Sequence, residues 1–241
     1  MTIAAFIMGL AFILIHLLAN ELIPTKRIHR LKWFSFSGGL AVSYVFVYVL
    51  PTLHKEQLNV KKYYDYLTME SELYFIGLIG VLMFYGIQKV VRKAQVNDHT
   101  HKARFLFWLQ ILFFGFYNML VAYTVISHNV SGVQAVFYGL AVGLHFIAVA
   151  HDLWREYADI YNKVGRYVLA LGIIAGWILG VTVSFSPIFE SIIFAFIAGA
   201  MMLNVLKYEL PPDEEAHFPT FAFGVISYTT VTMALKFFFQ W

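Results

Sequence analysis

The chain of 241 residues is 60% apolar and only 13% charged, with 24 phenylalanines, 15 tyrosines and no cysteine. Soluble domains hold roughly 45–50% apolar and about 25% charged residues, so this composition indicates a membrane protein and excludes a sizeable soluble domain. The lack of cysteine excludes disulfides, thiolate metal sites and a cysteine nucleophile, and the net charge of +3 is too small to indicate a nucleic-acid partner.

Apolar stretches of about 20 residues recur along the whole chain, and each is long enough to cross the hydrocarbon core of a bilayer. The first stretch lacks a basic n-region and a clear cleavage site, so we interpret it as a span and not as a signal peptide. We predict an all-α polytopic membrane protein, a single transmembrane domain over residues 1–241, in a plasma or inner membrane. The eight expected spans cover about residues 3–22, 33–53, 73–91, 105–127, 133–153, 167–185, 188–206 and 219–239.

Two polar stretches separate spans in the first half of the chain. The tyrosine-rich segment His54–Glu72 follows Pro51 near the end of span 2, and we expect it to form a loop. After span 3, His99 and His101 stand beside Asp98, a spacing that could hold a metal ion in a flexible loop. Both histidines are therefore candidate metal ligands.

Residues 139–157 are the most informative stretch, because they begin as the apolar run of span 5 and end in charge. His145 lies inside the apolar part, where an ionisable side chain costs about 3 kcal/mol or more unless it faces a partner or a wet cavity. His151 and Asp152 follow at the inner end of the span. With His145 they are candidate ligands for Zn, Fe or Mn, although such a run is also typical of a solvated helix end.

The basic residues are distributed unevenly between the two sets of loops. Thirteen of the seventeen Lys and Arg residues follow odd-numbered spans, and the other four are Lys55, Lys61, Lys62 and Lys236. Positively charged residues favour the cytoplasmic side of a membrane. We therefore expect both termini on the non-cytoplasmic side.

Glycines recur at the spacing that lets helices approach closely. Gly172, Gly176 and Gly180 share one face of span 6, and Gly139 and Gly143 share one face of span 5. Glycine at i and i+4 allows close backbone contact between membrane helices. These faces predict either packing within one chain or the interface of a homodimer.

Several polar side chains are expected near the middle of the membrane, because a helix rises about 1.5 Å per residue. If spans 2, 4, 5 and 7 are neighbours, these side chains form a polar cluster, which is typical of a substrate or ion pathway. Alternatively, His145 forms a hydrogen bond with Asn118 or a tyrosine and only locks two helices together. The candidate pathway residues are His145, Asn118, Tyr44, Tyr48, Tyr117 and Asn204.

The pattern as a whole resembles the ZIP (Zrt- and Irt-like) family of metal transporters. Residues 36–51 of span 2, which end at Leu50 and Pro51, are similar to the family's span-2 segment. Residues 141–147, which contain Leu144-His145, are similar to the start of its span-5 motif, and residues 198–211 to its span-7 segment. The resemblance implies a ZIP-like bundle of eight helices, and alternating access as the transport mechanism.

Most of the positions at which the family carries metal ligands hold other residues here. The family's span-4 motif is close to His-Asn-Phe-Pro-Glu-Gly, and the matching positions for the His and the Glu are Phe114 and Asn118. The Pro-Glu glutamates of spans 2 and 7 correspond to Thr52 and Pro212. A divalent cation needs several charged or imidazole ligands. The resemblance therefore implies a degenerate midplane site around His145.

Three functions follow from these observations. The first is a ZIP-like transporter of a divalent metal ion or another small solute, with the metal as substrate and no structural cofactor. The second is a non-transporting ZIP-like protein with a regulatory or assembly role. The third is an intramembrane metal-dependent hydrolase that uses His145, His151 and Asp152. It is the weakest, because six helical residues place the two histidines about 120° apart, and we expect no enzyme.

Overall fold

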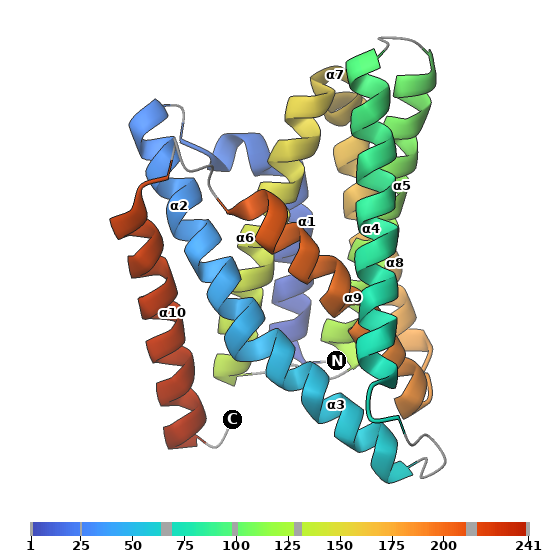
Figure 1. Ribbon diagram of the computed structural model, residues 1–241, viewed down its shortest axis with the longest axis vertical. Helices are drawn as coiled ribbons and strands as arrows, with labels where there is room; N and C mark the ends of the chain where they lie inside the picture. The colour runs from blue at the N-terminus through green and yellow to red at the C-terminus, as the bar shows by residue number, and fades with distance from the viewer. Residues whose placement is uncertain are drawn as a thin grey trace.

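The computed structural model describes residues 2–24, 26–63, 69–97, 101–127, 132–210 and 216–239, and within these ranges the regular secondary structure is helical. Among the described residues, three long helices are built from consecutive α and π segments (Figure 1). The elements are α1 (Ile3–Leu22), α2 (Arg27–Tyr44), η1 (Val45–Val49), α3 (Leu50–Tyr63), α4 (Glu72–Asn97), α5 (His101–Ser127), α6 (Gly132–Glu156), α7 (Ala158–Ile160), η2 (Tyr161–Gly165), α8 (Arg166–Thr182), α9 (Pro187–Asn204), η3 (Val205–Glu209) and α10 (Phe218–Phe239).

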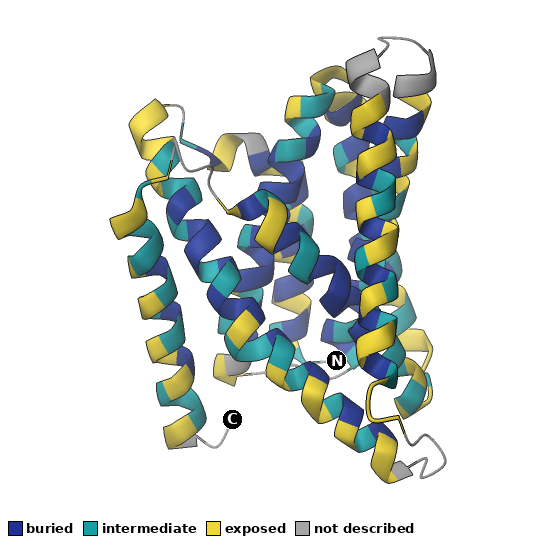
Figure 2. Ribbon diagram, viewed as in Figure 1, coloured by how far each residue is buried: buried dark blue, intermediate teal, exposed yellow. Residues whose placement is uncertain are grey.

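Within the described residues, seven continuous helices are long and apolar enough to cross a membrane. The apolar part of α1, Ile3–Ala19, is shorter. Large apolar side chains on the outside of the bundle, such as Leu82 of α4 and Ile226 of α10, are more than half exposed, as lipid-facing residues are (Figure 2). The prediction of an all-α, multi-pass membrane protein is confirmed.

The helices pack as two groups. The first helix group consists of α1, α5, α6 and α8, in which α5 packs against α8 and α1 packs against both α6 and α8. The second helix group consists of α2 with η1 and α3, α4, α9 with η3, and α10, in which α2 packs against α10 and α4 against α9 (Figure 1). Contacts between the groups are less extensive in total, and they include those of α2 with α6, α4 with α5, α5 with α9, and α6 with η3.

Glycines make the tightest contacts inside each group. A Cβ atom on Gly172 would lie 2.2 Å from the backbone oxygen of Gly115, and one on Gly199 would lie 1.8 Å from that of Gly77. Gly139 in α6 faces the side chain of Met8 in α1. The glycine faces predicted from the sequence therefore pack within the chain, and a homodimer that used them would have to displace these helices.

The helix that begins as α2 does not end near Pro51. Proline has no N–H, so the carbonyl of Val47, four residues earlier, loses its usual α-helical donor. The chain adopts the π-helical segment η1 at this point, and Nζ of Lys236 in α10 donates to the Val47 carbonyl oxygen at 2.7 Å. Lys236 thus replaces the missing donor, and the helix continues through the proline.

The segment His54–Glu72 was expected to form a loop, but residues 54–63 make up most of α3 and Glu72 begins α4, while residues 64–68 lie outside the described residues. Leu53 and Val60 lie on one side of α3 and pack with Leu73 and Ala195 of the second helix group. Gln57, on the same side, accepts a hydrogen bond from the backbone N–H of Leu73 at 2.8 Å. The loop prediction failed because mean hydropathy falls after Leu53, while the helical periodicity of the buried residues continues.

Candidate functional site

His145 lies in the middle of α6, with 2% of its side chain exposed, and it contacts both helix groups. Its Nδ1 donates to Oε1 of Glu209, which belongs to η3 of the second helix group. Its Nε2 lies 3.3 Å from the hydroxyl of Tyr117 in α5 of the first helix group. Both ring nitrogens therefore have partners, which is what a buried histidine requires.

Glu209 was not predicted as a site residue, because it follows the last apolar residues of span 7. The π-helical segment η3 explains its inward position. In a π-helix the backbone bond links residues five apart, so the side chains of Asn204 and Glu209 come together. Asn204 Nδ2 donates to Oε1 of Glu209 at 3.0 Å. The spacing of five residues between Asn204 and Glu209 is the sequence feature that could have predicted this pair. An α-helix would place the two residues on different faces, so the spacing is informative only if a π-helix is expected.

Asn118 is part of a second buried pair beside the first. Its side-chain amide donates to Nε2 of His16 at 2.8 Å and to the backbone oxygen of Leu169 at 3.4 Å. Tyr161 donates to the backbone oxygen of His16 at 3.3 Å. His16 Nδ1 and Asn118 Oδ1 have no hydrogen-bond partner among the described residues. The predicted partnership of His145 with a tyrosine is present, whereas Asn118 points to α1.

Four tyrosines form a cluster on one side of the His145–Glu209 pair. The ring centroids of Tyr44 and Tyr48 lie 5.2 Å apart in a stack, and the ring of Tyr138 is 6.0 Å from Tyr44 and 5.9 Å from Tyr48. Tyr228 of α10 lies 6.4 Å from Tyr44. Tyr44, Tyr138 and Tyr228 are buried, so this tyrosine cluster fills the space between the helix groups.

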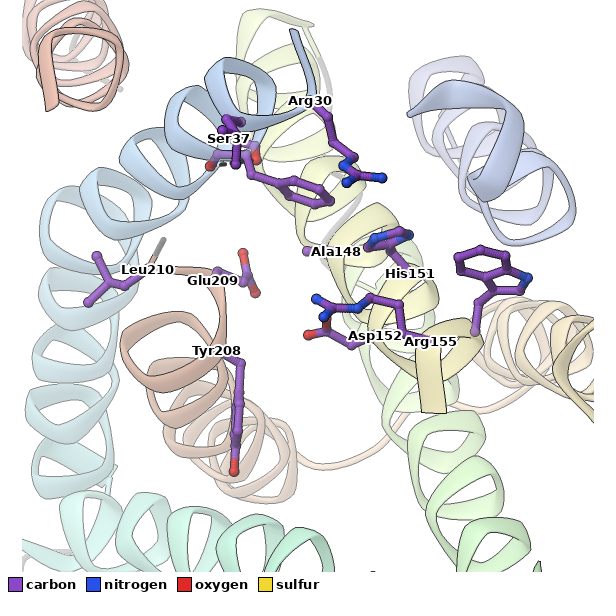
Figure 3. A pocket seen from close by; sticks show the side chains of 12 residues that line it. Arg30, Ser37, Ala148, His151, Asp152, Arg155, Tyr208, Glu209 and Leu210 are labelled. Carbon is purple, nitrogen blue, oxygen red and sulfur yellow. Dashed lines mark hydrogen bonds between the residues drawn. The ribbon is translucent and has the colours of Figure 1, made fainter. Parts of the chain in front are cut away.

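A cavity of about 290 Å³ lies on the other side of the pair, between α2, the end of α6 and η3 (Figure 3). Arg30 and Arg155 on its lining are exposed, whereas His151 and Glu209 are buried, so the cavity extends from the surface to buried residues that include Glu209. Both hydrogen bonds described for this carboxylate use Oε1. The residues that line the cavity are Arg30, Leu31, Phe34, Ser37, Ala148, His151, Asp152, Trp154, Arg155, Tyr208, Glu209 and Leu210.

The positions of the cavity and of the tyrosine cluster along the bundle follow from the order of their residues on α6 and α2. On α6, the cavity residues Ala148 and His151 come after His145, and Tyr138 comes two turns before it, about 10 Å away along the axis. On the α2 helix, Ser37 lines the cavity and Tyr44 follows two turns later. The His145–Glu209 pair therefore lies between a cavity towards the basic end and a tyrosine cluster towards the other end.

The predicted metal ligands are not assembled around one centre. The ring of His151 packs between Phe34 and Trp154, with ring centroids 5.1 and 5.6 Å away, and Asp152 lies on the cavity wall. Among the described residues, no group of three or more His, Asp or Glu side chains is arranged to hold a metal ion. His99 lies outside the described residues, and His101 begins α5 with a side chain that is not described.

Comparisons with known proteins give one partial match. A family model described as "Protein of unknown function (DUF3270)" matches residues 78–154, which run from α4 through α5 to the end of α6. The chain is similar to that family over these helices. The matched residues include Tyr117, Asn118 and His145, and they stop before Glu209. No curated protein and no solved structure matches the chain.

Proposed function

We propose that the protein is a membrane transporter that moves a small polar solute or a divalent metal ion by alternating access, on a scaffold that resembles the ZIP transporters. The observation that carries this proposal is the His145–Glu209 pair. It is almost completely buried, it joins the two helix groups, and Glu209 stands at the inner end of a cavity. Ionisable groups at such a depth are typical of transport pathways.

Alternating access needs a site at mid-depth that is open to one side and closed to the other. The cavity supplies the opening, and the tyrosine cluster supplies the closure. The contacts within each helix group are more extensive than those between the groups, which suits a rigid-body movement of one group against the other. In such a movement, the His145–Glu209 bond would break and the tyrosine rings would separate.

The orientation follows from the basic residues. With eight crossings, α1 begins and α10 ends at the same end of the bundle (Figure 1). The opposite end carries most of the Lys and Arg residues, including Arg30 and Arg155 at the cavity. The positive-inside rule puts this basic end in the cytoplasm and both termini outside. The cavity would then open inward.

The side chains at the site favour a polar solute over a bare metal ion. Glu209 lines the cavity, and its carboxylate already binds the imidazole of His145 behind it. Arg30 and Arg155 on the cavity lining would offset the attraction of Asp152 and Glu209 for a divalent cation. A metal ion would have to keep several water ligands, as Mg²⁺ does. A small solute with an anionic group would instead gain charge-assisted hydrogen bonds from the arginines.

Uptake into proteoliposomes tests the proposal. The purified protein is reconstituted and supplied with labelled divalent metals and with panels of small anionic and zwitterionic solutes. We expect uptake of at least one of them, and its loss in the variant His145→Ala. The matched control is His54→Ala, because His54 also bonds a tyrosine, Tyr74 Oη at 2.8 Å, but at the exposed end of the bundle. If no solute enters, or if His145→Ala transports normally, the proposal fails.

The second candidate is a ZIP-like protein that does not transport and serves a regulatory or assembly role. The bond between His145 and Glu209 favours it, because an interhelical pair of this kind can simply lock helices together. This alternative predicts no uptake, no bound metal by elemental analysis, and a stable partner that co-purifies. For an intramembrane hydrolase, the described residues supply no three-ligand metal group.

A further inference from the structure

Three basic side chains gather around two tyrosine rings at the basic end of α4 and η3. Nζ of Lys207 lies 4.2 Å from the ring centroid of Tyr85 and 5.1 Å from that of Tyr208. Arg92 lies 4.5 Å from the ring of Tyr208, and Lys89 lies 5.8 Å from that of Tyr85. We call these five residues the Lys–Arg–Tyr cluster. Cation–π contacts hold its positive charges close together despite their repulsion.

None of the three cations of this cluster forms an ion pair among the described residues, although Asp152 of α6 interacts electrostatically with Arg92 from a greater distance. The ion pairs found there, such as Lys61 with Glu70 and His145 with Glu209, involve none of the three. Lys89, Arg92 and Lys207 are all exposed. A group of three exposed cations that forms no ion pair attracts an anion, and both Arg and Lys bind phosphate.

The surroundings of the cluster indicate which kind of phosphate. Its residues occupy the final turns of the spanning segments Glu72–Lys93 and Pro187–Glu209, where a helix leaves the membrane. Next to them, towards the membrane centre, α4 exposes Leu78 at 50% and Leu82 at 60%. An apolar surface that runs up to a group of cations is complementary to a molecule with acyl chains and an anionic head. Free phosphate would leave the apolar part unused.

We propose that the Lys–Arg–Tyr cluster binds the headgroup phosphate of an anionic phospholipid, whose acyl chains lie along α4. Lys89, Arg92 and Lys207 contact the phosphate, and the tyrosine rings fix their positions. Basic pockets between spanning helices bind such headgroups in this way. Because Tyr208 also lines the cavity beside Glu209, the bound lipid contacts the same π-helical segment as the candidate site. The proposal does not depend on transport.

Lipid binding is measured on purified, delipidated protein in neutral detergent, by native mass spectrometry with added phosphatidylglycerol. The site variant is Lys89→Gln/Arg92→Gln/Lys207→Gln. The matched control is Lys32→Gln/Lys93→Gln/Lys163→Gln, which removes three exposed charges from the same end of the molecule. We expect the site variant to bind phosphatidylglycerol about tenfold or more weakly, and the control variant to bind it as the parent protein does.

Further measurements distinguish binding of an anionic lipid from binding of a neutral lipid or of free phosphate. Phosphatidylcholine is expected to bind weakly to all three proteins, and inorganic phosphate is expected not to compete with phosphatidylglycerol. Equal losses in the two triple variants would show diffuse charge attraction and overturn the proposal, as would an unchanged site variant. Competition by inorganic phosphate would overturn it in favour of a soluble anion. Thermal unfolding in neutral detergent checks that the variants are folded, and Tyr85→Leu, which leaves every charge in place, is expected to weaken lipid binding as well.

Discussion

His145 and Glu209 satisfy each other in a part of the molecule that has almost no contact with the surface. A buried charge or polar group without a partner is costly, whereas a buried pair with several hydrogen bonds costs much less. Tyr117 and Asn204 complete the pair, so that each ionisable group has two partners. The free energy of unfolding of the protein should therefore depend strongly on which member of this network is replaced.

Removal of the histidine alone should destabilise the protein more than removal of both ionisable groups. In His145→Ala the Glu209 carboxylate retains only Asn204, and breaking a buried pair costs about 3–5 kcal/mol. In His145→Ala/Glu209→Gln the unpaired charge is gone, so we expect part of the stability to return. The measurement is thermal unfolding of the purified proteins in one detergent. A double variant no more stable than His145→Ala would show that Glu209 is not a buried, paired carboxylate.

Much of this site could be found from the sequence, but its acidic partner could not. A histidine at mid-depth in span 5 requires a partner, and Tyr117 and Asn204 were among the candidates. Glu209 lies beyond the expected end of span 7 at about residue 206, because hydropathy falls at Lys207, and an α-helical period would place it on a different face from Asn204. The π-helical segment η3 changes that period. Asn118 was predicted at the same depth as His145, yet depth does not determine which neighbour a side chain faces.

The π-helical segments act on whole helices. η1 carries the α2 helix past Pro51, and η3 turns the end of the α9 helix so that Glu209 points inward. The α-helical segments pack against each other through glycines. At one helix crossing, two glycines can differ in how much space each has for a larger side chain. At the crossing of α4 and α9, a Cβ atom on Gly199 would lie 1.8 Å from the Gly77 oxygen, whereas one on Gly77 would lie 3.4 Å from the Ala195 oxygen.

This asymmetry predicts opposite outcomes for two identical substitutions. Gly199→Ala forces α4 and α9 apart, and we expect it to cost about 1–3 kcal/mol, as overpacking of a dense contact does. Gly77→Ala meets only an ordinary van der Waals distance, and we expect a small effect or a slight gain from the better helix propensity of alanine. Thermal unfolding of the two variants in the same detergent compares them. Equal losses of stability would contradict this close approach of the two helices.

At the scale of the whole molecule, the spanning helices can be predicted from the sequence better than their arrangement can. Apolar length and the period of polar residues locate a span, because each span must satisfy its own backbone in the bilayer. Which helices pack together depends on shape, for example on Gly172 against Gly115, and no single-helix pattern encodes that partner. The division into two helix groups, with the His145–Glu209 pair between them, therefore comes from the structure alone.

A cross-link between the helix groups should stop the proposed transport, and a cross-link within one group should not. The chain has no cysteine, so introduced pairs react alone. Ser37 of α2 and Ala148 of α6 line the same cavity from different groups, and a Ser37→Cys/Ala148→Cys variant bridged by a short cleavable bis-thiol reagent would tie the groups together. We expect uptake in the liposome assay to be abolished and to return when the bridge is cleaved, because the groups can no longer move past each other.

The control pair lies entirely in the second helix group. The hydroxyls of Ser43 in α2 and Thr229 in α10 are 2.6 Å apart, so Ser43→Cys/Thr229→Cys should react with the same reagent as readily. Since α2 and α10 move together in the proposed mechanism, we expect this bridge to leave uptake unchanged. If uptake is undiminished when every molecule carries the bridge between positions 37 and 148, relative movement of the groups at the cavity is ruled out. Inhibition by both bridges would place the movement inside the second group, between α2 and α10, where the structure shows close packing through Gly39 and Gly224.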